Sequence, residues 1–251
     1  MNALTRGLIT AAGLVALWQA LVWLSGVPPF LLPGPGRVAS TWWARADLIA
    51  GHAWITLAEI LLGLTGGVML GALSALTMTA IRGARAWLMP LLVMGQALPV
   101  FAIAPLLTLW FGYGMASKVV MAILIVYFPV TAALYDGLRR TEPGWLDLAA
   151  TMNATPWRVL RHVRLPAALP AFASGLRIAA AAAPIGAIVG EWVGSARGLG
   201  YLMLHANARA QTDLMFAALL TLMLMALALY AVIDTGLRRA LPWVPERDAS
   251  S

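Results

Sequence analysis

Six long apolar stretches constrain the fold of this chain more than any other feature of its sequence. A helix needs about 20 mostly apolar residues to cross the hydrocarbon core of a bilayer. The candidate spans run from Leu8 to Ser25, Trp54 to Ile81, Leu88 to Phe111, Lys118 to Leu134, Ala168 to Gly190 and Leu214 to Thr235. They predict an all-α fold, a polytopic membrane helix bundle with six transmembrane helices.

The composition agrees with a membrane bundle and excludes two other classes of protein. Apolar residues make up 61% of the 251 residues and charged residues 11%, whereas soluble domains carry about 25% charge. A soluble enzyme of this length could not bury so much apolar surface, and disordered chains combine low hydrophobicity with high charge. The length suits one bundle, so residues 1–251 are expected to form a single transmembrane domain.

The first stretch has an alternative interpretation as a signal peptide, because Arg6 precedes it. Its apolar run is long for a signal peptide, however, and no small-x-small cleavage site follows it. A retained span is therefore favoured, with residues 27–33 forming an extended loop behind it.

The arginines predict the orientation, because cytoplasmic segments of membrane proteins carry an excess of Lys and Arg. With the N-terminus inside, the inner segments contain most of the arginines, namely Arg6, Arg82, Arg85, Arg139, Arg140, Arg158, Arg161, Arg164, Arg238, Arg239 and Arg247. Both termini are therefore expected in the cytoplasm. The same bias accounts for the net charge of +7, so nucleic acid is not an expected partner.

Small residues recur at every fourth position in two of the spans. The two series are Gly63, Gly67, Gly71 and Ala75, and Ala182, Gly186, Gly190 and Gly194. Each series makes a smooth ridge that allows helices to approach closely in a membrane. Packing within the bundle is the favoured interpretation, and a dimer interface stays open for either ridge.

Polar side chains within the spans are the sharper indication of function, because each is costly in a membrane. The candidates to line a pathway through the bundle are Glu59, Gln96, Tyr135 and Glu191. Both glutamates lie near the outer ends of their spans, so placement at the membrane interface is the alternative for them. Prolines that would kink the helices around such a pathway are Pro99, Pro105, Pro129 and Pro184.

The sequence gives little support for catalysis or for metal binding. The chain has no cysteine, and its histidines, His52, His162 and His205, have no metal-ligand spacing. An intramembrane enzyme is disfavoured, because no serine shares a helix face or motif with His205. A proton-driven secondary transporter would use Glu59 and Glu191, but it leaves the loop described next unexplained.

Residues 139–166, between the fourth and fifth spans, are the most informative segment. Thr141 can cap a helix that runs from about Pro143 to Met152. Asn153 tolerates the left-handed conformation that ends helices. The segment therefore begins with a short helix and a tight turn.

A second, basic helix follows this turn. Thr155 and Pro156 form an N-cap and first-turn pair, and Pro166 is expected to end the helix. The pattern fits an amphipathic helix that rests on anionic lipid, and it also fits a docking surface for a cytoplasmic partner.

This segment resembles the EAA loop in permease subunits of bacterial ABC importers, whose pattern is roughly Glu-Ala-Ala-x-x-x-Gly, a spacer, and Ile-x-Leu-Pro. Aligned on Trp157, this chain has Asp147-Leu148-Ala149, Asn153 in the glycine position and Val163-Arg164-Leu165-Pro166. The carboxylate is kept but shortened, and the first alanine is replaced by leucine. Asn tolerates positive φ better than most residues, so the turn can survive.

The resemblance covers nearly the whole chain and is closest to the nitrate, sulfonate and taurine branch with its hydroxymethylpyrimidine-type relatives. The stretches that carry it are 96–107, 109–114, 190–194, 198–202 and 204–209. It implies a type I ABC importer permease fold in the bacterial inner membrane, with a core at about residues 54–236 and residues 139–166 as the coupling loop.

The resemblance also implies partners. These are a dimer of ABC ATPase subunits that binds ATP and Mg²⁺, a second permease subunit expected to be an identical chain, a periplasmic or extracellular substrate-binding protein, and membrane lipid. This chain has no Gly-x-x-x-x-Gly-Lys-Ser/Thr phosphate loop, so it is expected to be no enzyme and to hold no cofactor or metal of its own.

By the same resemblance, the loop rests in a groove of the ATPase. The residues assigned to this contact are Asp147, Ala149, Asn153, Ala154, Trp157, Leu165 and Pro166. Asp147 would face a basic group of the ATPase, and Asn153 would set the turn.

The expected substrate is a thiamine-precursor pyrimidine. Carboxylates near the pathway disfavour anions and can accept hydrogen bonds from an aminopyrimidine. Import of nitrate, a sulfonate or taurine is the alternative.

Overall fold

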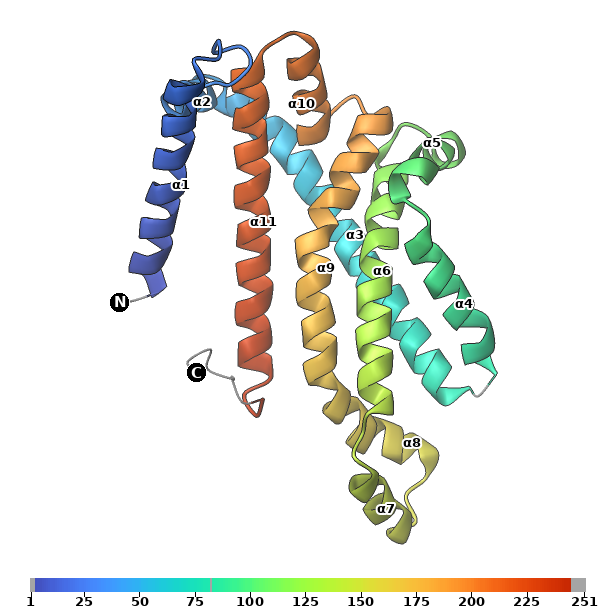
Figure 1. Cartoon of the computed structure of the whole chain (residues 1–251). Helices are drawn as coiled ribbons and strands as arrows, with labels where there is room; N and C mark the ends of the chain where they lie inside the picture. The colour runs from blue at the N-terminus through green and yellow to red at the C-terminus, as the bar shows by residue number, and fades with distance from the viewer. Residues whose placement is uncertain (1–2, 82, 245–251) are drawn as a thin grey trace.

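The computed structural model describes residues 3–81 and 83–244, and all regular structure in them is helical (Figure 1). The helices are α1 (Ala3–Ser25), α2 (Pro35–Ala44), α3 (Ala46–Ala80), α4 (Ala84–Ala97), α5 (Val100–Phe111), α6 (Met115–Arg139), α7 (Pro143–Thr151), α8 (Pro156–Val159), the π-helical turn η1 (Leu160–Arg164), α9 (Leu165–Gly194), α10 (Leu199–Ala208) and α11 (Thr212–Ala240). The predicted all-α membrane bundle is confirmed.

Within the described residues, 5 helical runs are long and apolar enough to cross a membrane, or 6 if the bent pair α4 and α5 forms one span. The runs are α1, α3, α6, α8 to α9, and α11. Each overlaps a predicted span. The largest difference at a boundary is in the run from α8 to α9, which begins at Pro156 rather than at Ala168. Helix α3 begins at Ala46 rather than at Trp54.

The third predicted span is not one continuous helix. The axes of α4 and α5 meet at 104°, whereas the sequence predicts one span from Leu88 to Phe111 that is only kinked at its prolines. Pro99 explains the break, because it has no N–H to donate and disfavours the helical conformation at the residue before it. Leu98 is accordingly extended, with ψ 118°.

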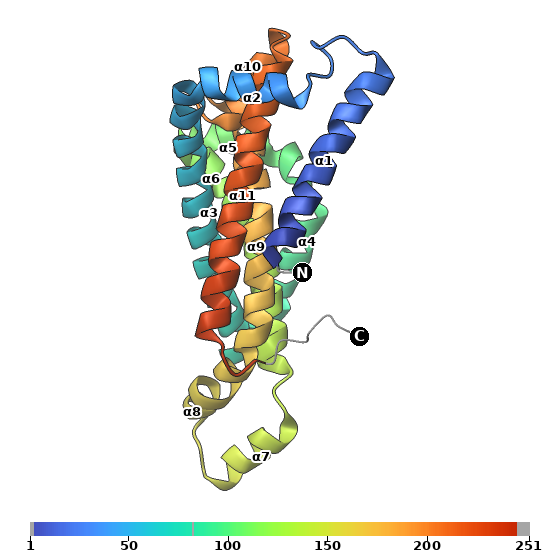
Figure 2. The ribbon, with the colours of Figure 1, turned by 90° about the vertical axis from the view of Figure 1, so that its left-hand side faces the viewer.

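The long helices α3, α6, α9 and α11 run along the bundle (Figure 1). Helices α2, α5 and α10 lie at one end, and α7 and α8 project beyond the other end (Figures 1 and 2). The first turn of α1 and the last turn of α11 both point toward the end that carries α7 and α8.

Small residues bring α3 and α9 close to α6. A Cβ atom on Gly63 would collide with the side chain of Ala122, and one on Gly186 would lie 2.6 Å from the Ala122 Cα. Gly67 meets Val126 in the same way. The two ridges therefore pack within the bundle at these positions, as the favoured interpretation predicts, because helices in lipid associate through close fit rather than through hydrophobic burial.

The outer helices are attached by fewer contacts. Arg177 of α9 donates from Nε to Asp234 of α11 at 2.6 Å, and Asp234 also accepts from Arg238 at 2.9 Å. Helix α1 stands at the edge of the bundle (Figure 2), where Trp18 stacks on Phe216 with ring centroids 5.7 Å apart.

The close approach of α9 to α6 can be tested with Gly186→Ala. The added methyl group must displace the backbone of α6 at Ala122, so we expect the free energy of unfolding to fall by about 1–3 kcal/mol. The measurement is thermal unfolding of the purified protein in mild detergent. Gly51→Ala is the matched control, because a Cβ atom there meets nothing within 4 Å. An equal unfolding temperature for both variants would contradict this packing.

Candidate functional site

Four buried side chains form a polar cluster where α3, α6 and α9 meet. We call Thr56, Glu59, Lys118 and Glu191 the outer polar cluster, because it lies toward the end of the bundle that carries α10; their exposed fractions are 0%, 2%, 1% and 1%. Thr56 donates from Oγ1 to Glu191 at 2.6 Å. Glu191 also accepts a hydrogen bond from the backbone N–H of Gly200. These bonds join the ends of α3 and α9 to the start of α10.

The loop before α10 is fixed by the same helices. The Leu199 N–H donates to Thr56 Oγ1 at 2.8 Å, and the Gly198 N–H donates to His52 Nδ1 at 3.0 Å. Gly198 has φ 109°, and a Cβ atom on it would collide with the Glu191 carboxyl. Glycine is therefore required at this position both for its backbone conformation and for the space that it leaves.

Lys118 extends from α6 into this carboxyl-rich region. Its ammonium group donates to the backbone carbonyl oxygens of Tyr113 at 2.6 Å and Gly114 at 2.9 Å, and to that of Gly194. It thereby caps the end of α9 and the loop before α6. A buried charge needs such partners, because an unpaired one costs several kcal/mol.

Glu59 is the least satisfied member of the outer polar cluster. Its carboxyl lies within hydrogen-bonding reach of the Glu191 carboxyl, but its Oε2 atom has no hydrogen-bond partner among the described residues. The sequence leaves pathway and interface positions open for Glu59 and Glu191. The structure brings both together inside one subunit, and a role for them in translocation stays a prediction.

Sequence reasoning missed the other members of this cluster. It uses Lys118 only as the first residue of the fourth span and assigns no role to Thr56. The bonds from Thr56 to Glu191, from the Leu199 N–H to Thr56 and from Lys118 to Gly194 join segments that are far apart in the chain. Gly198 and Gly200, three and five residues after Ser195, are the available sequence indication of a tight loop here.

The other two pathway candidates lie elsewhere. Tyr135 of α6 is 4% exposed and packs against α3, α4 and α9. The guanidinium groups of Arg85 and Arg139 lie 5.9 and 5.6 Å from its ring centroid. Gln96 belongs to α4 by its backbone, and its side chain lies outside the described part of the structure.

A groove of about 780 Å³ runs between the α4–α5 pair, α6 and α9. We call it the central groove; its lining includes Phe101, Phe128, Asp136, Ile178 and Ile185. Asp136 is the only titratable side chain among the described residues that line it. The groove therefore offers apolar and aromatic surface with one acceptor of hydrogen bonds.

Ala182 also lines the central groove, although it belongs to the small-residue series of α9. The other members of that series, Gly186, Gly190 and Gly194, pack against α6 or the segment before it. The ridge interpretation thus holds for three of its four positions, and the fourth faces the groove.

The loop between α6 and α9 has the predicted helix, turn and helix. Helix α7 ends at Thr151, and Asn153 has φ 53°. The Ala154 N–H donates to the Ala149 carbonyl at 3.0 Å, which closes the turn. Thr155 accepts at Oγ1 from the Arg158 N–H at 3.4 Å, so it caps α8 as predicted.

Two details of the loop differ from the sequence prediction. Thr141 does not cap α7, since its hydroxyl donates back to the Leu138 carbonyl at 3.2 Å and Glu142 holds the cap position. Pro166 does not end the second helix. The chain stays helical from α8 through η1 into α9, with Pro166 in the first turn of α9, because the wider π turn accommodates the missing N–H.

The loop exposes apolar side chains to its surroundings. Trp145, Leu148, Met152 and Trp157 are 51%, 61%, 74% and 67% exposed. Asp147 and Asn153 are exposed beside them, whereas Ala149 is buried. Such a patch, beyond the membrane-spanning part of the bundle, is typical of a protein interaction surface.

Two more of the loop's assigned residues lie at the base of the loop. Leu165 is half-buried against the Tyr135 cluster, and Pro166 lines a groove of about 710 Å³ between α7 and α9. Ala154 is half-buried in the turn. The assigned residues therefore divide between an exposed tip and a base that joins α9.

A bent membrane bundle with a central groove and a helical loop projecting from one end is the architecture of a transport subunit. Among the described residues, no group of three His, Asp or Glu side chains could hold a metal ion. Comparison with known proteins makes the class specific. Residues 63–244 match the family model described as "Binding-protein-dependent transport system inner membrane component", and the chain belongs to this family.

Three relatives align along most of this chain. A "Probable ABC transporter permease protein" of Haemophilus influenzae is 58% identical and covers 94% of this chain and 96% of its own length. The riboflavin transport system permease RibX of Chloroflexus aurantiacus is 38% identical, with coverage of 94% and 88%. The formylaminopyrimidine transport permease ThiX of Halalkalibacterium halodurans is 37% identical, with 92% of both chains covered.

The fold is similar to a solved structure. The inward-facing MetNI methionine ABC transporter contains a chain that superposes with a TM-score of 0.66 over 78% of this chain and 97% of its own length, at 18% identity. The type I importer permease fold is therefore confirmed. The protein is a multi-pass inner-membrane permease of a binding-protein-dependent ABC importer, it is not catalytic, and its ATPase partner binds the nucleotide.

The outer polar cluster can be tested with Glu191→Leu. This variant removes the carboxylate that accepts from the Thr56 hydroxyl and leaves the Gly200 N–H without its acceptor. We expect a loss of about 2–4 kcal/mol in the free energy of unfolding, because each buried group left unpaired costs about 1–3 kcal/mol. Asp47→Leu removes an exposed carboxylate and is the control. Thermal unfolding in detergent distinguishes them, and a Glu191→Leu protein as stable as the control would refute the network.

Proposed function

We propose that this permease imports a small, neutral or weakly basic nitrogen heteroaromatic compound, of the hydroxymethylpyrimidine type that serves as a thiamine precursor. A substrate-binding protein delivers the compound at the end of the bundle that carries α10. The proposal builds on the central groove as the translocation pathway.

The lining of the central groove is the observation that carries this proposal. Phe101 and Phe128 offer aromatic faces, and Asp136 offers a carboxylate that can accept hydrogen bonds from an amino group. Among the described lining residues there is no Lys or Arg that would compensate an anion. A sulfonate or nitrate ion would therefore pass beside a carboxylate without a cationic partner, which is unfavourable in a low dielectric.

The names of two relatives support the same chemistry. RibX is named for riboflavin and ThiX for formylaminopyrimidine, and both compounds are flat and rich in ring nitrogen. Import of taurine, another sulfonate or nitrate is the alternative, and the transport experiment below includes them.

We assign supporting roles to three of the four pathway candidates. Glu59 and Glu191 hold the outer end of α9, which forms one wall of the groove. Tyr135 holds the inner end of α6, next to Asp136. Gln96 stays a pathway candidate from the sequence, next to Gly95, which lines the groove.

The projecting loop is the proposed contact with the ATPase. Asp147 and Trp157 lie on its exposed surface, and the Asn153 turn sets the angle between α7 and α8. The exposed apolar side chains of α7 would fill a groove on the ATPase. Ala149, Ala154, Leu165 and Pro166 then fix the loop to α9, so that movement of the loop reaches the pathway.

We further propose a dimer of identical chains with both termini in the cytoplasm. The central groove is open on one side, and a second copy facing it would complete a pathway between the two subunits. The orientation is supported by the arginines of the projecting loop and by the directions of α1 and α11, which both point to the loop end.

The substrate is tested by uptake into proteoliposomes that contain the permease, its ATPase and its binding protein. We expect ATP-dependent uptake of a hydroxymethylpyrimidine and none of taurine, an alkyl sulfonate or nitrate. Uptake of any of these anions without uptake of the pyrimidine would refute the proposed substrate class.

The role of Asp136 is tested in the same assay with Asp136→Asn. Loss of the carboxylate is expected to lower the rate of pyrimidine uptake about tenfold, because a hydrogen bond to a charged group is worth about 1.5–3 kcal/mol. Asp47→Asn is the matched control outside the groove. Substrate affinity of the isolated binding protein stays unchanged in both cases, so an effect on uptake reports the pathway.

The coupling contact is tested with Asp147→Arg. The side chain is exposed, so the variant is expected to fold and insert normally, while the reversed charge weakens the contact with a basic group of the ATPase. The readout is co-purification of the ATPase in mild detergent. Asp47→Arg makes the same change of charge away from the loop and should retain the ATPase. Normal retention by Asp147→Arg would show that the contact lies elsewhere.

A further inference from the structure

Two arginines from different helices meet on one tyrosine ring at the loop end of the bundle. Arg85 comes from α4 and Arg139 from α6, and their guanidinium carbons lie 5.9 and 5.6 Å from the ring centroid of Tyr135. The ring is 4% exposed and held by α3, α4 and α9, whereas both arginines are exposed. The tyrosine therefore fixes two positive charges on a rigid base.

Among the residues that the structure describes, neither charge has a carboxylate partner. The ion pairs among the described residues join Arg37 to Asp213, and Arg177 and Arg238 to Asp234. Arg85 and Arg139 belong to none of them, although Asp136 is adjacent to Tyr135 in the chain. Two fixed guanidinium groups without a counter-charge are a binding arrangement for an oxyanion, to which arginine donates in a planar fork.

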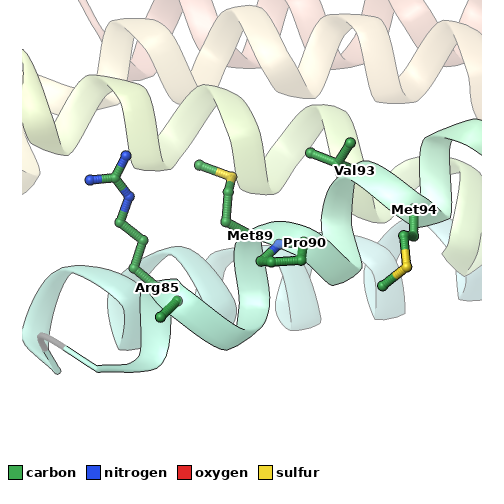
Figure 3. A pocket seen from close by; sticks show the side chains of 6 residues that line it. Arg85, Met89, Pro90, Val93 and Met94 are labelled. Atoms are coloured by element: carbon green, nitrogen blue, oxygen red, sulfur yellow. The ribbon is translucent and has the colours of Figure 1, made fainter.

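An apolar groove begins at the same point. It has a volume of about 690 Å³ and follows one face of α4 from Arg85 past Met89 and Pro90 to Val93 and Met94 (Figure 3). Arg85 and Met89 extend from the same side of the helix in this view, with the guanidinium at one end of the groove. Val93 and Met94 are 60% and 53% exposed. The groove thus leads from the cationic end along the membrane-spanning face of α4.

We propose that this surface binds one anionic phospholipid of the cytoplasmic leaflet. The phosphate lies between Arg85 and Arg139, and an acyl chain follows the groove on α4. The positive charges of Arg85 and Arg139 favour an anionic headgroup. The apolar groove on α4 beyond these charges favours a lipid over free phosphate. The inference goes beyond transport of the solute and depends on the proposed orientation only for the leaflet.

The site is tested by native mass spectrometry of the whole importer after removal of lipid with detergent. The importer is titrated with phosphatidylglycerol, phosphatidylcholine or inorganic phosphate. We expect the first phosphatidylglycerol to bind most tightly, and Arg85→Gln/Arg139→Gln to weaken it about thirtyfold, since an arginine near anionic lipid contributes about 1 kcal/mol. Phosphatidylcholine binding should not change, and inorganic phosphate should not compete at equal concentration.

Two controls separate this site from the general attraction of a basic protein to anionic lipid. Arg6→Gln/Arg239→Gln removes the same charge elsewhere and should leave the first binding step unchanged. Val93→Trp fills the groove without changing charge and should also weaken phosphatidylglycerol. Equal losses in both arginine pairs, an effect of neither, or unchanged binding in Val93→Trp would each overturn the proposal.

Discussion

The close fit of α3 and α9 against α6 is the constraint on which the rest of this permease depends. Lipid chains are as apolar as the helices, so burying leucine against leucine gains little in a membrane. Glycines at 63, 67 and 186 instead bring backbones together, with Ala122 between the two neighbouring helices. This three-helix unit fixes the wall of the central groove, the base of the projecting loop and the frame around the outer polar cluster.

The polar groups lie in two places around this unit, and each place limits the free-energy cost of having a polar group within a membrane. Glu191, Thr56 and Lys118 are enclosed at its outer end, where they hold backbone groups of loops that would otherwise lack partners. Asp136 faces the central groove instead. The carboxyl groups of this chain thus have two different environments. Glu191 is buried and stabilises the subunit, whereas Asp136 faces the groove and is available to a ligand.

The sequence predicts the membrane bundle well, because long apolar runs and four-residue spacing of small residues are local patterns. It also predicts the Asn153 turn and the Thr155 cap, because both depend on interactions between residues that are only a few positions apart. It expects a kink at Pro99 but not the 104° bend that divides the third span, and it misses the continuation of the helix through Pro166, because a proline can kink a helix, break it or lie in its first turn. The contacts of Thr56 with Glu191 and of Lys118 with Gly194 escape prediction because tertiary structure creates them.

The continuity of α8, η1 and α9 has a mechanical consequence. The 30 residues of α9 extend about 45 Å, from the base of the projecting loop to Glu191. A push delivered to the loop on one side of the membrane is thereby carried as the motion of a single rod to the opposite side. The π turn, Pro170 and Pro184 are the positions at which this helix can bend, and its far end lies among the hydrogen bonds of Thr56 and Gly200.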